Sequence, residues 1–305
     1  MTLINDGRPF RSDQIASLGL SPDGLRRLLR DGLLRRVVHG VYIDAEVADD
    51  RDARVASLAL VLPKDGVFCL GTASWLLGVD TFAPSERFDL VPIAMVPHGS
   101  VRGQRRGVRC IEGYLSNADV THVGNVPVTS PLRTACDLLR RARRPWALAA
   151  ADGMTHAGLV TPRDIRTRLG SLAGYPGIVQ ARALSHLIEP KAESSAESVQ
   201  RLRLVDAGFP RPVAQHAISN TRGREVARID NAYPAALVAC EHDGVAHHAE
   251  LEDLARDEQR RRWLTETRGW RFVLTNRFTL FGRDDAFERK VGELLDRRPR
   301  LPRQW

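Results

Sequence analysis

The 305-residue sequence has few cysteines and lacks the segments that direct a chain into a membrane. Its four cysteines, Cys69, Cys110, Cys136 and Cys240, are widely separated and form no C-x-x-C motif. Such spacing argues against a disulfide framework or a zinc site. The N-terminus has no basic region followed by an apolar stretch, and the longest apolar run, Val55–Leu62, is too short to span a bilayer. We therefore expect a cytoplasmic protein with reduced thiols and no membrane partner.

Lysine is also scarce, and the basic side chains are almost all arginine. The 45 Lys and Arg residues exceed the 37 Asp and Glu residues, which gives a net charge of +8. This balance favours a polyanionic partner. No Walker-type phosphate loop, G-x-S-x-G or H-E-x-x-H motif is present, so nucleoside-triphosphatase, α/β-hydrolase and zinc-protease functions have no support. The length favours two or three domains.

Residues 11–43 predict a helix, a turn, a second helix and a tight hairpin. The first helix is expected near Ser12–Leu18. The second, Ser21–Asp31, opens on a serine followed by a proline, which is a strong start signal, and it ends before a glycine. The hairpin turns at His39-Gly40. This outline is typical of a winged helix that uses Ser21–Asp31 as its recognition helix.

Five arginines on this second helix and the hairpin form a compact basic set. Phosphates and base edges of double-stranded DNA are typical targets of such a set. The alternative is a small structural unit that binds protein. The candidate DNA-binding residues are Arg26, Arg27, Arg30, Arg35 and Arg36.

Residues 51–188 predict a mixed α/β middle region without a recognisable site. Its expected strands lie near Phe88–Val96 and Val108–Ile111. Its expected helices begin at Pro131 and Pro162, each after a capping residue, or cover residues 147–154 and 178–187.

The last third, residues 193–305, predicts a second α/β domain after a short linker at 189–192. A helix over 195–206 precedes three strands, expected at 213–218, 225–229 and 236–240. A helix over 250–268, a strand over 270–275 and a helix over 285–295 complete the domain. The order α-β-β-β-α-β is the outline of the PD-(D/E)XK nuclease core.

Three carboxylates come together at the ends of two of these strands. Asp230 is expected to end one strand before a turn at Asn231–Pro234, and Glu241 and Asp243 follow an apolar strand on one face. Converging carboxylates repel one another unless a cation neutralises them. Oxygen ligands select Mg²⁺ or Mn²⁺, which can activate water for attack on a phosphodiester. The alternative is that these acids only close a turn and an exposed strand.

Residues 194–281 resemble the endonuclease-like domains related to the very-short-patch-repair (Vsr) endonuclease, within the PD-(D/E)XK superfamily. The matching segments are SAESVQRLRLVDAGFPRP, ARIDNAYP, LVACEHDGVAHH, RDEQRRRWL and GWRFVLTNR. The resemblance implies that Asp230 and Glu241 bind the metal and that Glu197 is an auxiliary carboxylate. Asp243 stands where the superfamily has its lysine, and Arg261 stands where relatives tend to have Asp, which puts catalysis in doubt.

Other residues near these acids have two interpretations each. Glu197 also completes a capping box with a serine three residues earlier. His247 and His248 could donate protons or contact phosphate, although histidines in loops more often do neither. Arg256 and Arg260 share a helix face that could meet phosphate or could simply be solvated.

The N-terminal segment FRSDQIASLGLSPDGLRRLLRDGLLRRVVHGVYI resembles the winged helix of AbiEi-type antitoxins, which are autorepressors of toxin–antitoxin operons. FCLGTASWLLGV and VPVTSPLRTACDLLR resemble their middle region. We therefore predict a multidomain α/β protein with a winged helix at 1–50, an AbiEi-like region at 51–188 and an endonuclease-like domain at 193–305. The favoured hypothesis is a Mg-dependent DNA endonuclease. The alternative is an antitoxin-like regulator with an inactive nuclease-type domain, a cognate toxin and a homodimeric state.

Overall fold

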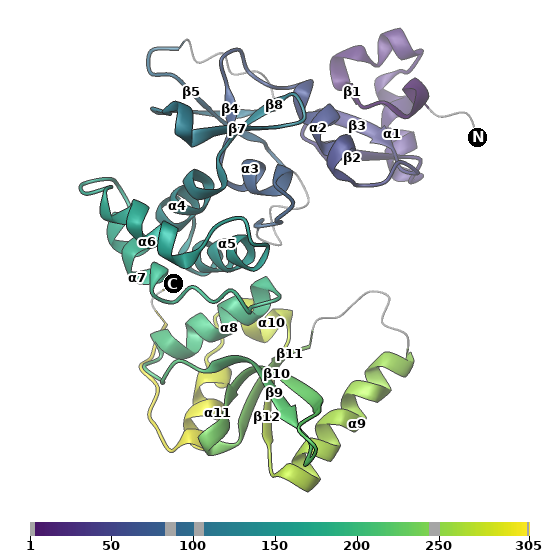
Figure 1. Cartoon of the computed structure of the whole chain (residues 1–305). Helices are drawn as coiled ribbons and strands as arrows, with labels where there is room; N and C mark the ends of the chain where they lie inside the picture. Colours follow the sequence, from purple (N-terminus) through teal and green to yellow (C-terminus); the bar gives the residue numbers. More distant parts are fainter. Residues whose placement is uncertain (1–3, 83–89, 101–106, 244–250, 304) are drawn as a thin grey trace. The chain divides into compact units, whose positions relative to one another are not determined.

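The computed structural model describes residues 4–82, 90–100, 107–243, 251–303 and 305. The chain divides into two compact units, Met1–Leu138 and Leu139–Trp305 (Figure 1). Within the described residues, three separate β-sheets accompany the helices, which confirms the predicted mixed α/β class. None of the helices within the described ranges is long and apolar enough to cross a membrane. All four cysteines have free thiols.

The first unit opens with a three-stranded antiparallel sheet and one helix. The strands have the order β1-β3-β2, and their bounds are β1 (Phe10–Arg11), β2 (Leu34–Val38) and β3 (Val41–Asp44). The hairpin predicted at His39-Gly40 is confirmed, because β2 and β3 pair on either side of it. Instead of the predicted helix near 12–18, two 3-10 turns cover 12–14 and 16–18. Polar side chains bond the local backbone there, as the Gln14 side chain does to the Arg11 N–H at 2.8 Å, and such bonds compete with an α-helix.

Helix α1 (Pro22–Arg30) begins and ends as its sequence predicts. The Ser21 hydroxyl accepts a hydrogen bond from the Gly24 N–H at 3.0 Å, which satisfies one of the free donors of the first turn. Gly32 follows the helix with φ +70°, a conformation that glycine adopts without strain. Leu25 packs with Phe10 and Leu34 in a small core that fixes the helix on the sheet.

The remainder of the first unit is a five-stranded sheet with helices α2 (Arg51–Ala59), α3 (Leu70–Leu76) and the start of α4 (Pro131–Arg141). The strand order is β6-β5-β4-β8-β7, with β4 (Val67–Phe68), β5 (Ile93–Val96), β6 (Arg109–Glu112), β7 (Val120–Val123) and β8 (Val126–Thr129). The predicted strand near Phe88–Val96 exists from Ile93 onward, while Phe88 and Asp89 lie outside the described residues. The predicted strand near Val108–Ile111 corresponds to β6.

The second unit contains two groups of elements. The first group is the helical segment α5 (Arg144–His156), α6 (Pro162–Gly170) and α7 (Ile178–Ser185). The second group is a four-stranded sheet with the order β12-β11-β10-β9. Its elements are α8 (Ser195–Asp206), β9 (Val213–Ser219), β10 (Glu225–Tyr233), β11 (Val238–His242), α9 (Leu251–Arg268), β12 (Arg271–Thr275), α10 (Arg277–Phe281) and α11 (Ala286–Leu295). The predicted order of helix, three strands, helix and strand is confirmed.

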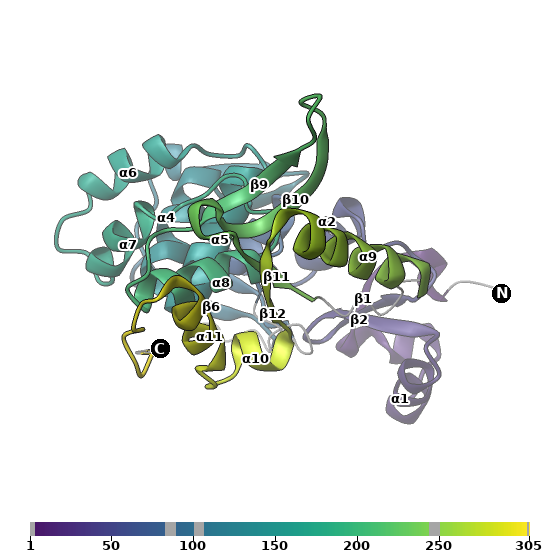
Figure 2. The ribbon, with the colours of Figure 1, turned by 90° about the horizontal axis from the view of Figure 1, so that it is seen from below.

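Both faces of this sheet are covered by helices, with α8 and α11 on one side and α9 on the other (Figure 1 and Figure 2). Leu204 of α8 and Val291 of α11 pack with Val238 and Cys240 on one face. Leu264 of α9 packs with Ile229 and Ala239 on the other face. Strand β11 is therefore buried on both sides, as its apolar sequence predicts.

The boundaries of β10 and β11 differ from their predictions, since β11 covers Val238–His242 instead of 236–240. Strand β10 does not end at Asp230, because Asn231 is fully buried and continues the ladder opposite Cys240. Asparagine is disfavoured in strands, so the sequence predicted a turn there. The Asn231 side chain instead donates to Gln200 Oε1 at 3.0 Å and to the Glu197 carbonyl at 3.2 Å, which compensates for its burial. The turn to β11 follows Tyr233.

Buried ion pairs join the helices of the second unit. Arg203 of α8 forms two hydrogen bonds with Glu288 of α11, at 2.7 and 2.5 Å, and both side chains are almost fully buried. Arg201 of α8 forms a second buried ion pair with Asp152 of α5, through Nη2 alone. The helical segment and the sheet thus pack as parts of one compact unit. The division into domains at 1–50, 51–188 and 193–305 stays a prediction.

Candidate functional site

Helix α1 presents a basic surface. Arg26, Arg27 and Arg30 are all exposed, whereas Leu25 faces the core. Arg26 has Asp23 as an exposed ion-pair partner, and Arg30 lies 3.6 Å from Asp31. Exposed pairs of this kind are weak, so both guanidiniums can exchange a carboxylate for a phosphate. The helix therefore offers charges that could contact a nucleic acid backbone.

The two arginines of the hairpin have different surroundings. Arg35 is half-buried, and its guanidinium donates to the carbonyls of Val47 and Ala48 at 3.1 and 3.2 Å. It thereby fixes the segment that follows β3. Arg36 is exposed on the same strand. Of the two, Arg36 is the better placed for a ligand.

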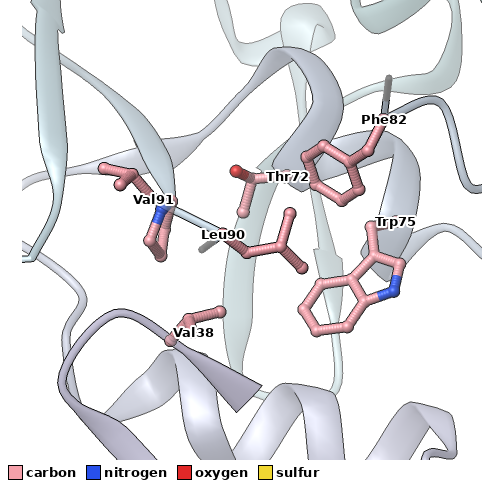
Figure 3. A pocket seen from close by; sticks show the side chains of 7 residues that line it. Val38, Thr72, Trp75, Phe82, Leu90 and Val91 are labelled. Atoms are coloured by element: carbon pink, nitrogen blue, oxygen red, sulfur yellow. The ribbon is translucent and has the colours of Figure 1, made fainter. Parts of the chain in front are cut away.

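A small apolar pocket lies between the hairpin, helix α3 and the segment that precedes β5 (Figure 3). Val38 of β2 lines this pocket together with Trp75 and Leu90. The His39 N–H donates to the Leu90 carbonyl at 2.8 Å. The Thr72 hydroxyl, which also lines the pocket, already accepts a hydrogen bond from the Ile93 N–H at 2.9 Å. We interpret the pocket as part of the apolar contact that holds the hairpin in place, and not as a ligand site.

The predicted carboxylates converge in the second unit. Asn231 pairs with Cys240, so Asp230 and Glu241 lie next to each other at the end of the paired region. Asp230 Oδ2 accepts a long hydrogen bond of 3.4 Å from the His242 N–H. Burial raises the pKa of Asp230 to about 7, and the nearby charges of Glu197 and Glu241 add to this effect. The sequence-predicted acids Asp230, Glu241 and Glu197 are therefore in electrostatic contact.

Glu197 caps its helix and also lies beside the other carboxylates, so both interpretations of its place in the structure apply. Its backbone N–H donates to the Ser194 hydroxyl at 3.2 Å, and its carboxylate accepts from the Glu193 N–H at 3.0 Å. It thus stabilises the start of α8 in the manner of a capping residue. The same carboxylate accepts from Gln215 at 2.8 Å and lies close enough to raise the pKa of Asp230.

Arginines of α9 neutralise the other two acids. Arg260 binds both oxygens of Glu241, through Nη1 at 3.0 Å and Nη2 at 3.1 Å. Arg261 Nη1 lies 2.6 Å from Asp243 Oδ1 and 3.9 Å from Glu241 Oε2. Burial alone would lower the pKa of Arg260, but the hydrogen bonds and charge of Glu241 raise it above its ordinary value. Arg260 therefore remains charged beside Glu241, and Arg261 pairs with Asp243 nearer the surface.

The carboxylates in this arrangement do not fit a divalent metal. Glu241 uses both oxygens on Arg260, and Glu197 accepts the bonds from the Glu193 N–H and the Gln215 amide with one oxygen, Oε2. Within the described ranges, no three His, Cys, Asp or Glu side chains are placed so that they could hold a metal ion. The Mg²⁺ or Mn²⁺ site predicted for Asp230, Glu241 and Asp243 therefore stays a prediction without support from the geometry.

The remaining predicted residues of this region are two arginines of α9, which have different surroundings, and two histidines. Arg256 is exposed on α9, whereas Arg260 faces the carboxylates and also donates to the Arg228 carbonyl at 3.2 Å. The predicted common phosphate-binding face of these two arginines stays a prediction. His247 and His248 lie outside the described residues.

Three polar residues that the sequence analysis did not single out form hydrogen bonds around the acids: Gln200, Gln215 and Thr275. Gln200 of α8 donates to the Glu241 carbonyl and to the Thr275 hydroxyl, both at 3.1 Å. Gln215 lies in β9 with φ +49°, an unfavourable value for a residue with a side chain. Its signal in the sequence is only a polar residue in an otherwise ordinary strand.

Two family models match parts of the chain. Residues 1–43 match "Transcriptional regulator, AbiEi antitoxin", and residues 66–189 match "AbiEi antitoxin C-terminal domain". Neither model extends past residue 189, so neither supports the predicted relation of the last third to Vsr-type endonucleases.

Two relatives come from strains of Mycobacterium tuberculosis. They are "Uncharacterized protein Rv2248" of strain ATCC 25618 / H37Rv and "Uncharacterized protein MT2308" of strain CDC 1551 / Oshkosh. Each is 34% identical over 245 residues, which cover 80% of this chain and 86% of the relative. Because this stretch is longer than 189 residues, the similarity includes part of the last third.

Proposed function

Because the chain belongs to the same family as these M. tuberculosis proteins and carries both AbiEi antitoxin regions, we propose that it is a DNA-binding transcriptional regulator of the antitoxin type. We assign residues 1–50 as its winged helix and α1 as the recognition helix. The strand order β1-β3-β2 and the helix that precedes the β2–β3 hairpin support this assignment.

The observation that carries the proposal is the exposed arginine set of α1. Arg26, Arg27 and Arg30 project from a helix whose start is capped and whose apolar side is packed. A rigid helix with cations on its outer side can enter a major groove without reorganising. Arg36 on the hairpin adds a charge of the same sign.

The test is DNA binding by the full-length protein, measured by fluorescence anisotropy on the duplex upstream of its own gene. A scrambled duplex of the same composition gives the non-specific affinity. Replacing Arg26, Arg27 and Arg30 together by Gln should weaken binding by at least about tenfold and reduce the salt slope by about 3, since each phosphate contact contributes about 0.9.

A matched control replaces two exposed arginines of the second unit, Arg262 and Arg289, by Gln. Each pairs with an acid one helical turn away, at 3.1 and 2.9 Å, as surface arginines commonly do. The control should bind DNA like the wild type. Equal affinity for both duplexes, or an α1 variant that binds like the control, would contradict the proposal.

We further propose a cognate toxin as the protein partner, since the matching models describe antitoxins. Co-expression of the chain with the product of the neighbouring gene tests this. Relief of growth inhibition by the wild type is the expected result, and inhibition that persists would contradict the partner. The homodimer stays a prediction.

Endonuclease activity is the second candidate, favoured by the convergence of Asp230 and Glu241. We expect no cleavage, because Arg260 already binds the carboxylate of Glu241. Plasmid cleavage with Mg²⁺ or Mn²⁺ tests this directly. Nicking that is lost in both Asp230→Ala and Glu241→Ala would establish the endonuclease and its acids.

A further inference from the structure

The contact between Arg260 and Glu241 has the geometry of a permanent ion pair. Two parallel N–H···O bonds of 3.0 and 3.1 Å join the guanidinium to the carboxylate. Only 4% of the surface of Glu241 is exposed. Bidentate pairs of this kind are stronger and more directional than single hydrogen bonds. A metal ion that binds Glu241 has to compete with Arg260 for these oxygens, and a displaced guanidinium would keep only Asp257, at 3.5 Å, as an ion-pair partner among the described residues.

The position of Arg260 is fixed by the rest of its helix. Leu264, one turn further along α9, is fully buried against the sheet. Arg261 follows directly and binds Asp243 at 2.6 Å. One helix thus delivers two positive charges to two of the predicted metal-binding acids, Glu241 and Asp243. The packing of α9 against the sheet therefore determines where these two charges lie.

We propose that Arg260 is the resident cation of this carboxylate pocket and takes the place that a divalent metal ion would occupy. The second unit then folds and acts without a metal. The pocket becomes able to bind one only when this guanidinium is removed, because Glu241 and Asp230 then lose their nearest compensating charge and the more distant Arg261, 3.9 Å from Glu241, remains. This inference does not depend on whether the first unit binds the predicted DNA.

The test compares Mn²⁺ binding by three full-length proteins: the wild type, Arg260→Gln and the control Arg262→Gln. Arg262 lies on the same helix but is exposed and pairs with Glu258. Mn²⁺ is titrated alone and followed by calorimetry, and thermal unfolding is recorded with EDTA and with Mn²⁺.

Wild type and Arg262→Gln should unfold at the same temperature with EDTA and with Mn²⁺ and should share the same weak surface binding of the ion. Arg260→Gln should unfold at a lower temperature, recover part of the loss with Mn²⁺ and bind Mn²⁺ on the order of tenfold more tightly than the wild type. Wild-type binding as tight as that of Arg260→Gln, or a wild type that EDTA destabilises, overturns the proposal.

If Arg260→Gln does not fold, Glu241→Gln decides the question. Stoichiometric Mn²⁺ binding by the wild type that Glu241→Gln abolishes would show a metal site and overturn the proposal. Identical weak binding by the wild type and Glu241→Gln supports a pocket that already contains its cation.

Discussion

Replacing Asp230 by Asn should stabilise the protein at neutral and alkaline pH. Burial and the neighbouring acids raise the pKa of Asp230 from 3.8 to about 7. The folded state therefore binds this proton more tightly than the unfolded state does. The stability linked to the proton is complete below about pH 4 and is lost as the pH rises through 7. Asparagine has the same shape, can accept the bond from the His242 N–H and carries no charge to bury.

The size of the effect follows from the difference of about three pH units. Each unit corresponds to about 1.4 kcal/mol, so the ionised carboxylate costs the folded state at most about 4 kcal/mol above pH 7. Asp230 is only partly buried, and Arg260 offsets part of the repulsion, so we expect Asp230→Asn to gain about 2 kcal/mol at pH 8. The gain should fall toward zero near pH 4.

The assay is urea denaturation of the wild type and Asp230→Asn between pH 4.5 and 8. Hydrogen exchange of the β10 and β11 amides serves as the local readout, because the two units need not unfold together. The control is Asp285→Asn, since a hydrogen bond from Arg289 lowers the pKa of Asp285. This control should show no gain at any pH. A variant at position 230 that is less stable than the wild type at pH 8, or whose gain does not depend on pH, would refute the reasoning.

Two further predictions concern single contacts. Ser21→Ala removes the hydroxyl that accepts the Gly24 N–H and should cost about 1 kcal/mol, seen as a lower midpoint in thermal unfolding followed by circular dichroism; an unchanged midpoint would show that the cap contributes nothing. Glu288→Gln leaves the fully buried Arg203 without a counter-charge and should cost about 3–5 kcal/mol in urea denaturation, and a loss below about 1 kcal/mol would contradict the buried pair.

Local signals predicted helix starts best where a capping residue precedes a proline. Ser21-Pro22 and Thr161-Pro162 both mark helix starts, because a capping side chain before a proline leaves few other conformations. The sequence could not predict that β10 continues through Asn231, since that depends on Gln200 of a distant helix satisfying a buried amide. Short strands such as β4 (Val67–Phe68) were also missed, because two residues carry no measurable periodicity.

The sequence predicted that the acids of the candidate site lie together, but it did not predict which cations face them. Asp230 and Glu241 were found because carboxylates at the end of an apolar strand are unusual and costly. Arg260 was assigned to a phosphate-binding face, since the spacing along a helix gives neighbours on that helix but not the direction in which it faces the sheet. The orientation of α9 depends on Leu264, which packs against a strand far away in the sequence.

The repulsion that made a metal ion the favoured interpretation of the sequence can be relieved in more than one way. A divalent cation is one solution, and a guanidinium beside one acid with a proton on the other is a second. Glu241 has the guanidinium of Arg260, and a pKa near 7 allows Asp230 to hold a proton close to neutral pH. If both compensations operate, the pocket needs no external charge. Converging carboxylates alone are then insufficient to identify a nuclease, and the side chains that face them decide the assignment.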